Sequence, residues 1–457
     1  MLLYLINPCN PIQSTVNLKE NRWRKYFVWK PLGLLVLAGL TPPEWDIRVI
    51  DENLRTPDYT KMPCPDLVGI TAFTSQAVRA YEVAVEFRNH GVPVVMGGIH
   101  ATMCSAEALE FVDAVVKGEA ESIWTQVLKD VQQGKLKRVY TGIQLEMDKV
   151  PLARHELLPK GYHFGSIQTT RGCPLNCTFC SVTPFNGKLY RHRPIEDILQ
   201  EFKLIPEKYV LIVDDNLIGI HKEQIARAKD LFRAMIQANL RKKWMAQMTI
   251  NMADDDELLR LAAKAGCFGV YIGFESYTEK GLVEVRKKFN IQNNRDFKAS
   301  VRRIQRHGIV VCGSFIMGLD VDERGIGQKI ADTATHYGFY ILNTLFLTPL
   351  PGTQLWEKME AEGRIVVNAF PEDWKYYTLG FPVMNYKHLS WDEIRSEMNS
   401  CYRIYYTNMH ILRRIFTSFW CTRKIISMKV VLVTNISYKL KLRSELRSIP
   451  GIEPTHG

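Results

Sequence analysis

Residues 169–180 read Thr-Thr-Arg-Gly-Cys-Pro-Leu-Asn-Cys-Thr-Phe-Cys and gather three cysteines, Cys173, Cys177 and Cys180, within eight positions. They follow a short apolar run, Ser166–Thr170, which predicts a strand, so the thiols are expected on a loop at its carboxyl end. Thiolates spaced C-x3-C-x2-C can hold one iron–sulfur cluster, because soft sulfur ligands suit iron–sulfur centres. Three protein ligands leave one iron open, which is typical of a catalytic metal rather than a structural one.

The other seven cysteines are scattered singly along the 457-residue chain, which excludes a disulfide scaffold. Zinc is the alternative metal that the cysteine loop could bind. It would need a fourth Cys or His close by, and the nearest downstream residue of this kind, His192, lies in the basic stretch 188–193. We therefore expect the cluster.

The cysteine loop opens a series of six predicted strands separated by helical patterns. Eight such units would close a full barrel, so six predict a partial, open (β/α)6 barrel of the TIM type over residues 166–369. The predicted strands are 166–170, 209–213, 244–250, 268–274, 310–316 and 341–347.

Residues 1–135 also alternate between short β-branched runs and helical patterns, which predicts a doubly wound, Rossmann-like sheet. Such sheets bind ligands beyond the carboxyl ends of their strands. Residues 136–165 show no sustained period and are expected to form a linker, and residues 370–457 to form a mostly helical C-terminal region. The strands predicted in the first domain are 2–6, 47–50, 67–72, 92–96 and 114–116, with helices at 76–89 and 121–133.

The net charge of +11 is concentrated near the C-terminus, where residues 410–447 hold nine Lys or Arg and a single acid. Apolar residues recur there at helical spacing between the arginines, as in Ile411, Ile415 and Phe419, so we expect a basic amphipathic segment able to contact an anionic membrane surface. The alternative is a helix that packs on the barrel and exposes a solvated basic face. Nucleic acid is not expected, because no base-stacking platform accompanies the charge.

No apolar run reaches the length of a membrane span, and the N-terminus lacks the basic region and cleavage site of a secretory signal. The expected location is the cytoplasm, with peripheral membrane contact through residues 410–447.

The cysteine spacing, with an aromatic residue before the last cysteine on the first loop of a partial barrel, resembles the radical S-adenosylmethionine (SAM) superfamily. The resemblance implies a 4Fe-4S cluster whose open iron is chelated by SAM. An electron from a flavodoxin- or ferredoxin-type donor then cleaves SAM to a 5′-deoxyadenosyl radical, which abstracts hydrogen from an unreactive carbon. The protein supplies binding, orientation and exclusion of water.

The same resemblance assigns roles to residues at the ends of later strands. It places Phe179 and the glycine-rich segment of Gly313 and Gly318 near the adenine of SAM. Asp214 matches a position near its amino end, and Glu275 a position near its ribose or methionine. Taken singly, Gly and Asp at strand ends can also reflect the needs of turns.

The first 135 residues resemble the cobalamin-binding domain of class B radical SAM enzymes. Paired glycines, Gly97 and Gly98, allow a bulky ligand to approach the backbone, and the resemblance assigns cobalamin contacts to these two residues and to Thr71, Ser75 and His100. The D-x-H-x-x-G loop that supplies an axial histidine in many cobalamin proteins is absent, since Glu52 and Asn53 follow Asp51. Many radical SAM enzymes of this architecture also lack that histidine and would hold cobalamin without it, whereas some relatives keep the domain and have lost the cofactor.

The overall pattern resembles the hopanoid methylases and also the anaerobic magnesium-protoporphyrin ester cyclases. We expect methylation of an unactivated carbon of a hydrophobic small molecule, lipid-like or tetrapyrrole-like, with cobalamin as methyl carrier. The alternative is a radical SAM cyclase, oxidase or carbon–carbon coupling enzyme without methyl transfer. A third hypothesis, from another class, is a membrane-associated scaffold or electron carrier whose cluster does not bind SAM.

Overall fold

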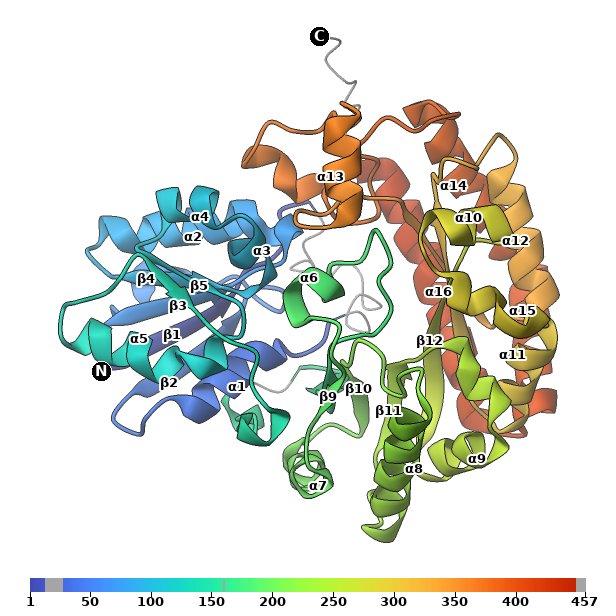
Figure 1. Cartoon of the computed structure of the whole chain (residues 1–457), viewed down its shortest axis with the longest axis horizontal. Coiled ribbons are helices and arrows are strands. Elements are labelled where there is room, and N and C mark those ends of the chain that lie inside the picture. The colour runs from blue at the N-terminus through green and yellow to red at the C-terminus, as the bar shows by residue number, and fades with distance from the viewer. Residues whose placement is uncertain (13–27, 159–160, 449–457) are drawn as a thin grey trace.

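The computed structural model describes residues 1–12, 28–158 and 161–448, the last of them as backbone only from residue 441 onward. Figure 1 shows two parallel sheets side by side, one N-terminal and one central, with the C-terminal helices on the far side of the central sheet. None of the described helices is both long enough and apolar enough to cross a membrane.

Six parallel strands form the N-terminal sheet in the order β2-β1-β3-β4-β5-β6. Their apolar residues are largely buried, as expected for a parallel sheet that helices cover on both faces. The strand order reverses at β1, and this switch point opens a crevice beyond the carboxyl ends of the strands. The strands are β1 (Leu2–Asn7), β2 (Asp46–Asp51), β3 (Leu67–Thr71), β4 (Val94–Gly97), β5 (Ala114–Lys117) and β6 (Val139–Thr141).

Helices cover both faces of this sheet and carry its two hydrophobic cores (Figure 1). On one face lie α1 (Leu32–Leu40) and α5 (Trp124–Gln132), and on the other α2 (Ala77–Asn89), α3 (Gly98–Met103) and α4 (Ser105–Phe111). Strand β6 falls inside residues 136–165, for which the sequence predicts a linker. With three residues, two of them exposed, it has too little apolar pattern to be recognised.

The central domain is an open sheet of six parallel strands in the order β14-β13-β12-β11-β10-β7, so the expected partial barrel is confirmed. Its strands are β7 (Phe164–Ile167), β10 (Tyr209–Ile212), β11 (Lys243–Gln247), β12 (Cys267–Glu275), β13 (Val310–Met317) and β14 (Ile341–Phe346). Its helices are α7 (Ile195–Leu204), α8 (Lys222–Gln237), α9 (Asp256–Lys264), α10 (Glu279–Glu284), α11 (Phe297–Arg306), α12 (Ile326–Tyr337) and α13 (Gln354–Ala361). A small hairpin of β8 (Thr170–Arg171) and β9 (Arg191–His192) and helix α6 (Val182–Asn186) frame the cysteine loop.

Three C-terminal helices, α14 (Trp391–Tyr405), α15 (Asn408–Thr422) and α16 (Ile425–Ser448), complete the chain. Tyrosine hydroxyls close the open edge of β14: that of Tyr402 accepts from the N–H of Thr344 and donates to its carbonyl, and that of Tyr406 does the same for Leu342. An edge strand leaves such groups unpaired, so these bonds give the barrel a covered end.

Candidate active site

The cysteine loop leaves the carboxyl end of the first barrel strand and is fixed by backbone bonds. The N–H of Cys173 donates to the carbonyl of Gly187 at 3.3 Å. Gly172, just before it, has φ +86°, and a side chain there would collide with the backbone of Leu189. Only glycine fits this left-handed, crowded position. Gly172 therefore fixes the turn that leads into the cysteine loop.

The three thiols lie close to one another and to one buried lysine, Lys287. Burial raises the pKa of the Cys177 thiol to about 11 and that of Cys180 to about 12, and the neighbouring cysteines contribute to both shifts. The ammonium of Lys287 acts in the opposite direction on all three thiols. Metal binding must displace these thiol protons, so a positive charge here favours thiolate ligands.

Among the described residues, no three His, Cys, Asp or Glu side chains converge tightly enough to hold a single metal ion. A cluster makes a different demand, because each cysteine binds a different iron and the sulfur atoms stand further apart. Three neighbouring, unbridged thiols on one loop fit such a cluster. Cys173, Cys177 and Cys180 would hold it, leaving one iron open.

Two adjacent aspartates after β10 anchor this loop. Asp214 is buried and accepts from the N–H and hydroxyl of Thr169, at 2.6 and 2.5 Å, and from the hydroxyl of Thr170 at 3.0 Å. Burial raises the pKa of its carboxyl to about 6. Asp215 accepts from the N–H of Gly172 at 2.9 Å. The resemblance places Asp214 near the amino end of SAM; in the structure its bonds tie β7 and β8 to β10.

Glu275 ends β12 in a strained, left-handed conformation with φ +63°, beside a shift in strand register. Its carboxylate accepts a hydrogen bond from the Lys287 ammonium at 2.6 Å, and both residues are buried. Burial lowers the pKa of Lys287, but the charge and hydrogen bond of Glu275, together with the charges of Cys177 and Cys180, outweigh burial and raise it. Strain in a non-glycine residue beside a buried ion pair marks a functional position.

Sequence reasoning missed Lys287. It lies between Arg286 and Lys288, so the run looks like a solvated basic face, yet only the middle residue is buried.

The other residues expected at the SAM site lie around this centre. Phe179 is partly buried against the main core. A side chain at Gly313 would collide with the ring of Phe339, so packing explains that glycine. Gly318 has φ +101°, and a side chain there would collide with the ring of Tyr386.

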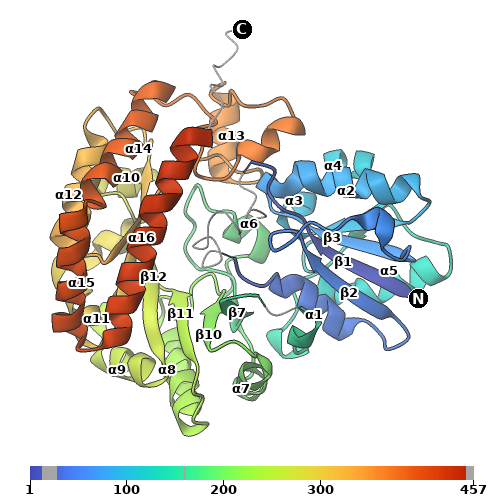
Figure 2. The same cartoon turned by 180° about the vertical axis from the view of Figure 1, so that it is seen from behind.

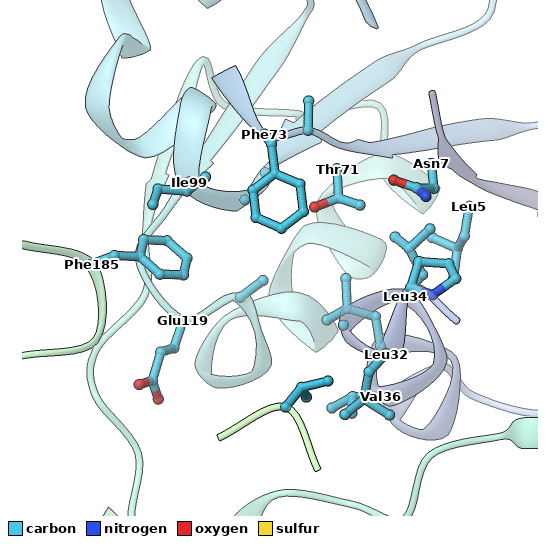
Figure 3. Close-up of a pocket in the computed structure, with 18 of the residues that line it drawn as sticks. Leu5, Asn7, Leu32, Leu34, Val36, Thr71, Phe73, Ile99, Glu119 and Phe185 are labelled. Carbon is cyan, nitrogen blue, oxygen red and sulfur yellow. The ribbon is translucent and has the colours of Figure 1, made fainter. Parts of the chain in front are cut away.

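A cavity of about 580 Å³ lies at the carboxyl ends of the N-terminal strands. Its size is typical of small-molecule sites. Figure 3 shows Phe73 and Phe185 turned towards it, with Leu32, Leu34 and Val36 of α1 on the far side. Residues from the two sheets line it together, since Gln168, Arg171, Val213 and Asp215 come from the barrel. The cavity therefore adjoins the cysteine loop.

Three of the five residues expected to contact cobalamin, Thr71, Gly97 and Gly98, line this cavity, whereas Ser75 and His100 do not. Gly98 has φ +88°, and a Cβ there would lie 2.6 Å from the Thr71 hydroxyl. Position 98 in the cavity wall is therefore a glycine, because the backbone turns tightly against β3 there. A large apolar ligand with polar edge groups fits such a lining, so the residues present suit a corrin.

His100 is fully buried on the other side of α3. Its Nε2 lies 2.8 Å from the hydroxyl of Tyr81, and that hydroxyl donates to Glu107 at 2.7 Å. The indole N–H of Trp374, from beyond the barrel, donates to both oxygens of Glu107 at 2.9 and 3.0 Å. His100 thus belongs to a network that joins the N-terminal domain to the C-terminal region.

A second network joins the domains at the cavity wall. The Glu119 carboxylate, just after β5, pairs with Arg171 at 3.2 Å and with Arg191, and accepts from the N–H of Leu145 at 2.9 Å. Arg171 also pairs with Glu121. Burial alone would raise the pKa of Glu119, but the two guanidinium groups outweigh it and lower the pKa. Arg171, the residue before Gly172, is thereby held against the cavity.

Comparison with known proteins matches residues 25–128 to the model of the B12 binding domain and residues 167–328 to that of the Radical SAM superfamily. The bacteriochlorophyllide d C-8(2)-methyltransferase of Chlorobaculum tepidum is 28% identical, over 92% of this chain and 94% of its own. The hopanoid C-2 methylase of Rhodopseudomonas palustris is 28% identical, over 74% of this chain and 65% of its own. The solved structure of the radical SAM methyltransferase TsrM from Kitasatospora setae, 18% identical, superposes with a TM-score of 0.66 over 88% of this chain and 89% of its own.

The open barrel and its three-cysteine loop define a radical SAM enzyme, for which the cofactors are a 4Fe-4S cluster and SAM. The chain thus combines a radical SAM domain with an N-terminal B12-binding domain, and cobalamin is its third cofactor.

Proposed function

We propose that this protein transfers a methyl group from SAM, by way of cobalamin, to an unactivated carbon of a hydrophobic small molecule, lipid-like or tetrapyrrole-like. The observation that carries the proposal is the cavity shared by the two sheets, because it places a site lined by both domains beside the cysteine loop. The likeness to two methylases of large apolar substrates supports the same choice. Residues 1–135 would bind cobalamin, and residues 166–369 the cluster and SAM.

When bound, the three cofactors supply a transferable methyl group and a carbon-centred radical. The chain's residues position them. Cys173, Cys177 and Cys180 ligate the cluster, and Thr71, Gly97 and Gly98 form the corrin wall. Glu275 and Phe179 contact SAM, and the ammonium of Lys287 neutralises negative charge beside the cluster. Asp214 and Asp215 hold the loop in place.

The role of Lys287 can be separated from that of its neighbour. Lys287→Met leaves the Glu275 carboxylate buried without its partner, whereas Lys288→Met removes an exposed charge. Because Glu275 would contact SAM and Lys287 holds its carboxylate through a charge-assisted hydrogen bond worth about 1.5–3 kcal/mol, we expect Lys287→Met to misplace that carboxylate and to lower SAM affinity about tenfold. Calorimetric titration with SAM, at matched iron content, measures it. Equal affinities for the two variants would contradict the role.

Two partners complete the proposal. Cleavage of SAM needs an electron, for which a donor of the flavodoxin or ferredoxin type would serve. Residues 410–447 would bring the protein to a membrane surface, where hydrophobic substrates collect.

The function is tested with anaerobically reconstituted protein, added cobalamin, SAM whose methyl group carries deuterium, and reduced flavodoxin or another low-potential reductant to supply the electrons. Without a substrate, we expect cobalamin-dependent release of S-adenosylhomocysteine. With bacteriochlorophyllide d or an unmethylated hopanoid as probe, we expect S-adenosylhomocysteine and 5′-deoxyadenosine in equal amounts, and a product that carries the label. Formation of 5′-deoxyadenosine alone would overturn methyl transfer in favour of cyclisation, oxidation or carbon–carbon coupling.

A further inference from the structure

Helix α15 packs on the barrel in an unusual orientation. It contacts α11 and α16 and turns Ile411 and Ile415 inward. It also buries an arginine, Arg414, whose guanidinium lies over the ring of Tyr405 at 3.9 Å and donates to the side chain of Asn435. A helix that needed only to cover the barrel would bury its apolar residues and expose its charges.

The opposite face of α15 exposes large apolar side chains instead. Five of them, each 40% to 77% exposed, recur at the spacing of one helical face: Met409, Leu412, Phe416, Phe419 and Trp420. We call these five residues the apolar stripe. Of the seventeen exposed large hydrophobic residues in the described part of the chain, seven fall between 409 and 432, so the exposure is concentrated rather than scattered.

The charge around the apolar stripe has one sign. Arg413, Arg423 and Lys429 are exposed on α15 and at the start of α16. No acidic residue occurs between positions 398 and 444 of the chain. An apolar helix face with Trp and Phe, flanked along the chain by basic residues, complements a bilayer interface that carries anionic lipid headgroups.

We propose that the apolar stripe and its basic flanks dock this protein on the surface of an anionic lipid bilayer, with α15 lying in the plane of the interface. This specifies the membrane contact of the proposed function and does not depend on methyl transfer. Figures 1 and 2 place α15 on the side of the barrel remote from the N-terminal sheet. Docking through α15 therefore leaves the cavity between the two sheets clear of the bilayer.

The test is flotation of the full chain with vesicles of phosphatidylcholine alone or mixed equally with phosphatidylglycerol. We expect at least about tenfold stronger binding to the mixed vesicles, with a loss of that preference at high salt. In the double variant Phe416→Ser with Trp420→Ser, binding falls at least about tenfold, because two large apolar groups no longer enter the interface. Ile143→Ser, which changes an exposed apolar residue of the N-terminal domain, leaves binding unchanged.

A second measurement keeps the proposal falsifiable should the double variant fold poorly. Brominated lipid quenches tryptophan fluorescence on contact, so the wild type should be quenched by mixed vesicles and Trp420→Phe should not. No binding to mixed vesicles, equal binding by the wild type and the double variant, or a dimer in solution that the double variant dissolves would each overturn the proposal. The assay contains neither SAM nor substrate, so these outcomes leave the test of methyl transfer untouched.

Discussion

Replacement of Glu119 by Gln tests the ion-pair network that joins the two domains. The carboxylate faces Arg171 and Arg191 with 4% to 9% of these three side chains exposed. Removing one partner of a buried pair costs about 3–5 kcal/mol. Arg171 keeps Glu121, and glutamine still accepts a hydrogen bond, so we expect the lower figure, about 3 kcal/mol. At about 2–4 °C per kcal/mol, thermal unfolding should begin about 6–12 °C earlier.

The matched control is Glu156→Gln. Glu156 also pairs with an arginine, at 2.8 Å, but it is 65% exposed, and such pairs contribute at most about 1 kcal/mol. The pKa of Glu119 is lowered in the folded chain, so its contribution is complete above the ordinary glutamate pKa of about 4.3 and is lost as pH falls through the folded value. Calorimetry between pH 8 and pH 4 should show that the loss of stability caused by Glu119→Gln becomes smaller only near pH 4. Equal losses of stability in Glu119→Gln and Glu156→Gln, or a loss in Glu119→Gln that does not change with pH, would refute the reasoning.

Cys177→Ala should abolish bound iron and the visible absorbance of the cluster, whereas Cys64→Ala, at an exposed cysteine, should preserve both; iron retained by the first variant would contradict the ligand assignment. Gly98→Ala should weaken corrin retention, because its Cβ would press on the Thr71 hydroxyl, while Gly91→Ala has a similar positive φ and open space around it, so retention should stay normal. Oxidative loss of the cluster should leave the far-ultraviolet circular dichroism intact, because both sheets have hydrophobic cores independent of the metal; unfolding on bleaching would show otherwise.

All strands of the two sheets except β6 could be predicted, because each is a short buried apolar run with helical patterns beside it in the sequence. The three-cysteine loop could be recognised equally well, since the spacing of its cysteines is itself the signal, and their role as cluster ligands stays a prediction. Strand β6 was not predictable, because three residues with two exposed leave no period. Its pairing with β5 depends on the tertiary fold.

The other features of the site could not be predicted from local sequence patterns. Glu275 and Lys287 are twelve residues apart and meet only because the chain turns back after β12. Gly313 lies in a glycine-rich segment. The ring of Phe339, which leaves no space for a side chain at this position, belongs to a loop that is distant in the sequence. On α15 the periodicity predicts the helix and leaves open which face turns inward, because apolar residues occupy both faces. Buried Arg414 decides this through its contacts with Tyr405 and Asn435.

The central claim is that one chain holds a cluster and a corrin side by side. Anaerobic reconstitution with iron, sulfide and hydroxocobalamin, followed by desalting and an absorbance spectrum with iron and cobalt counts, measures it directly. We predict retention of one corrin per chain together with the cluster. A bound cluster without corrin would contradict the claim.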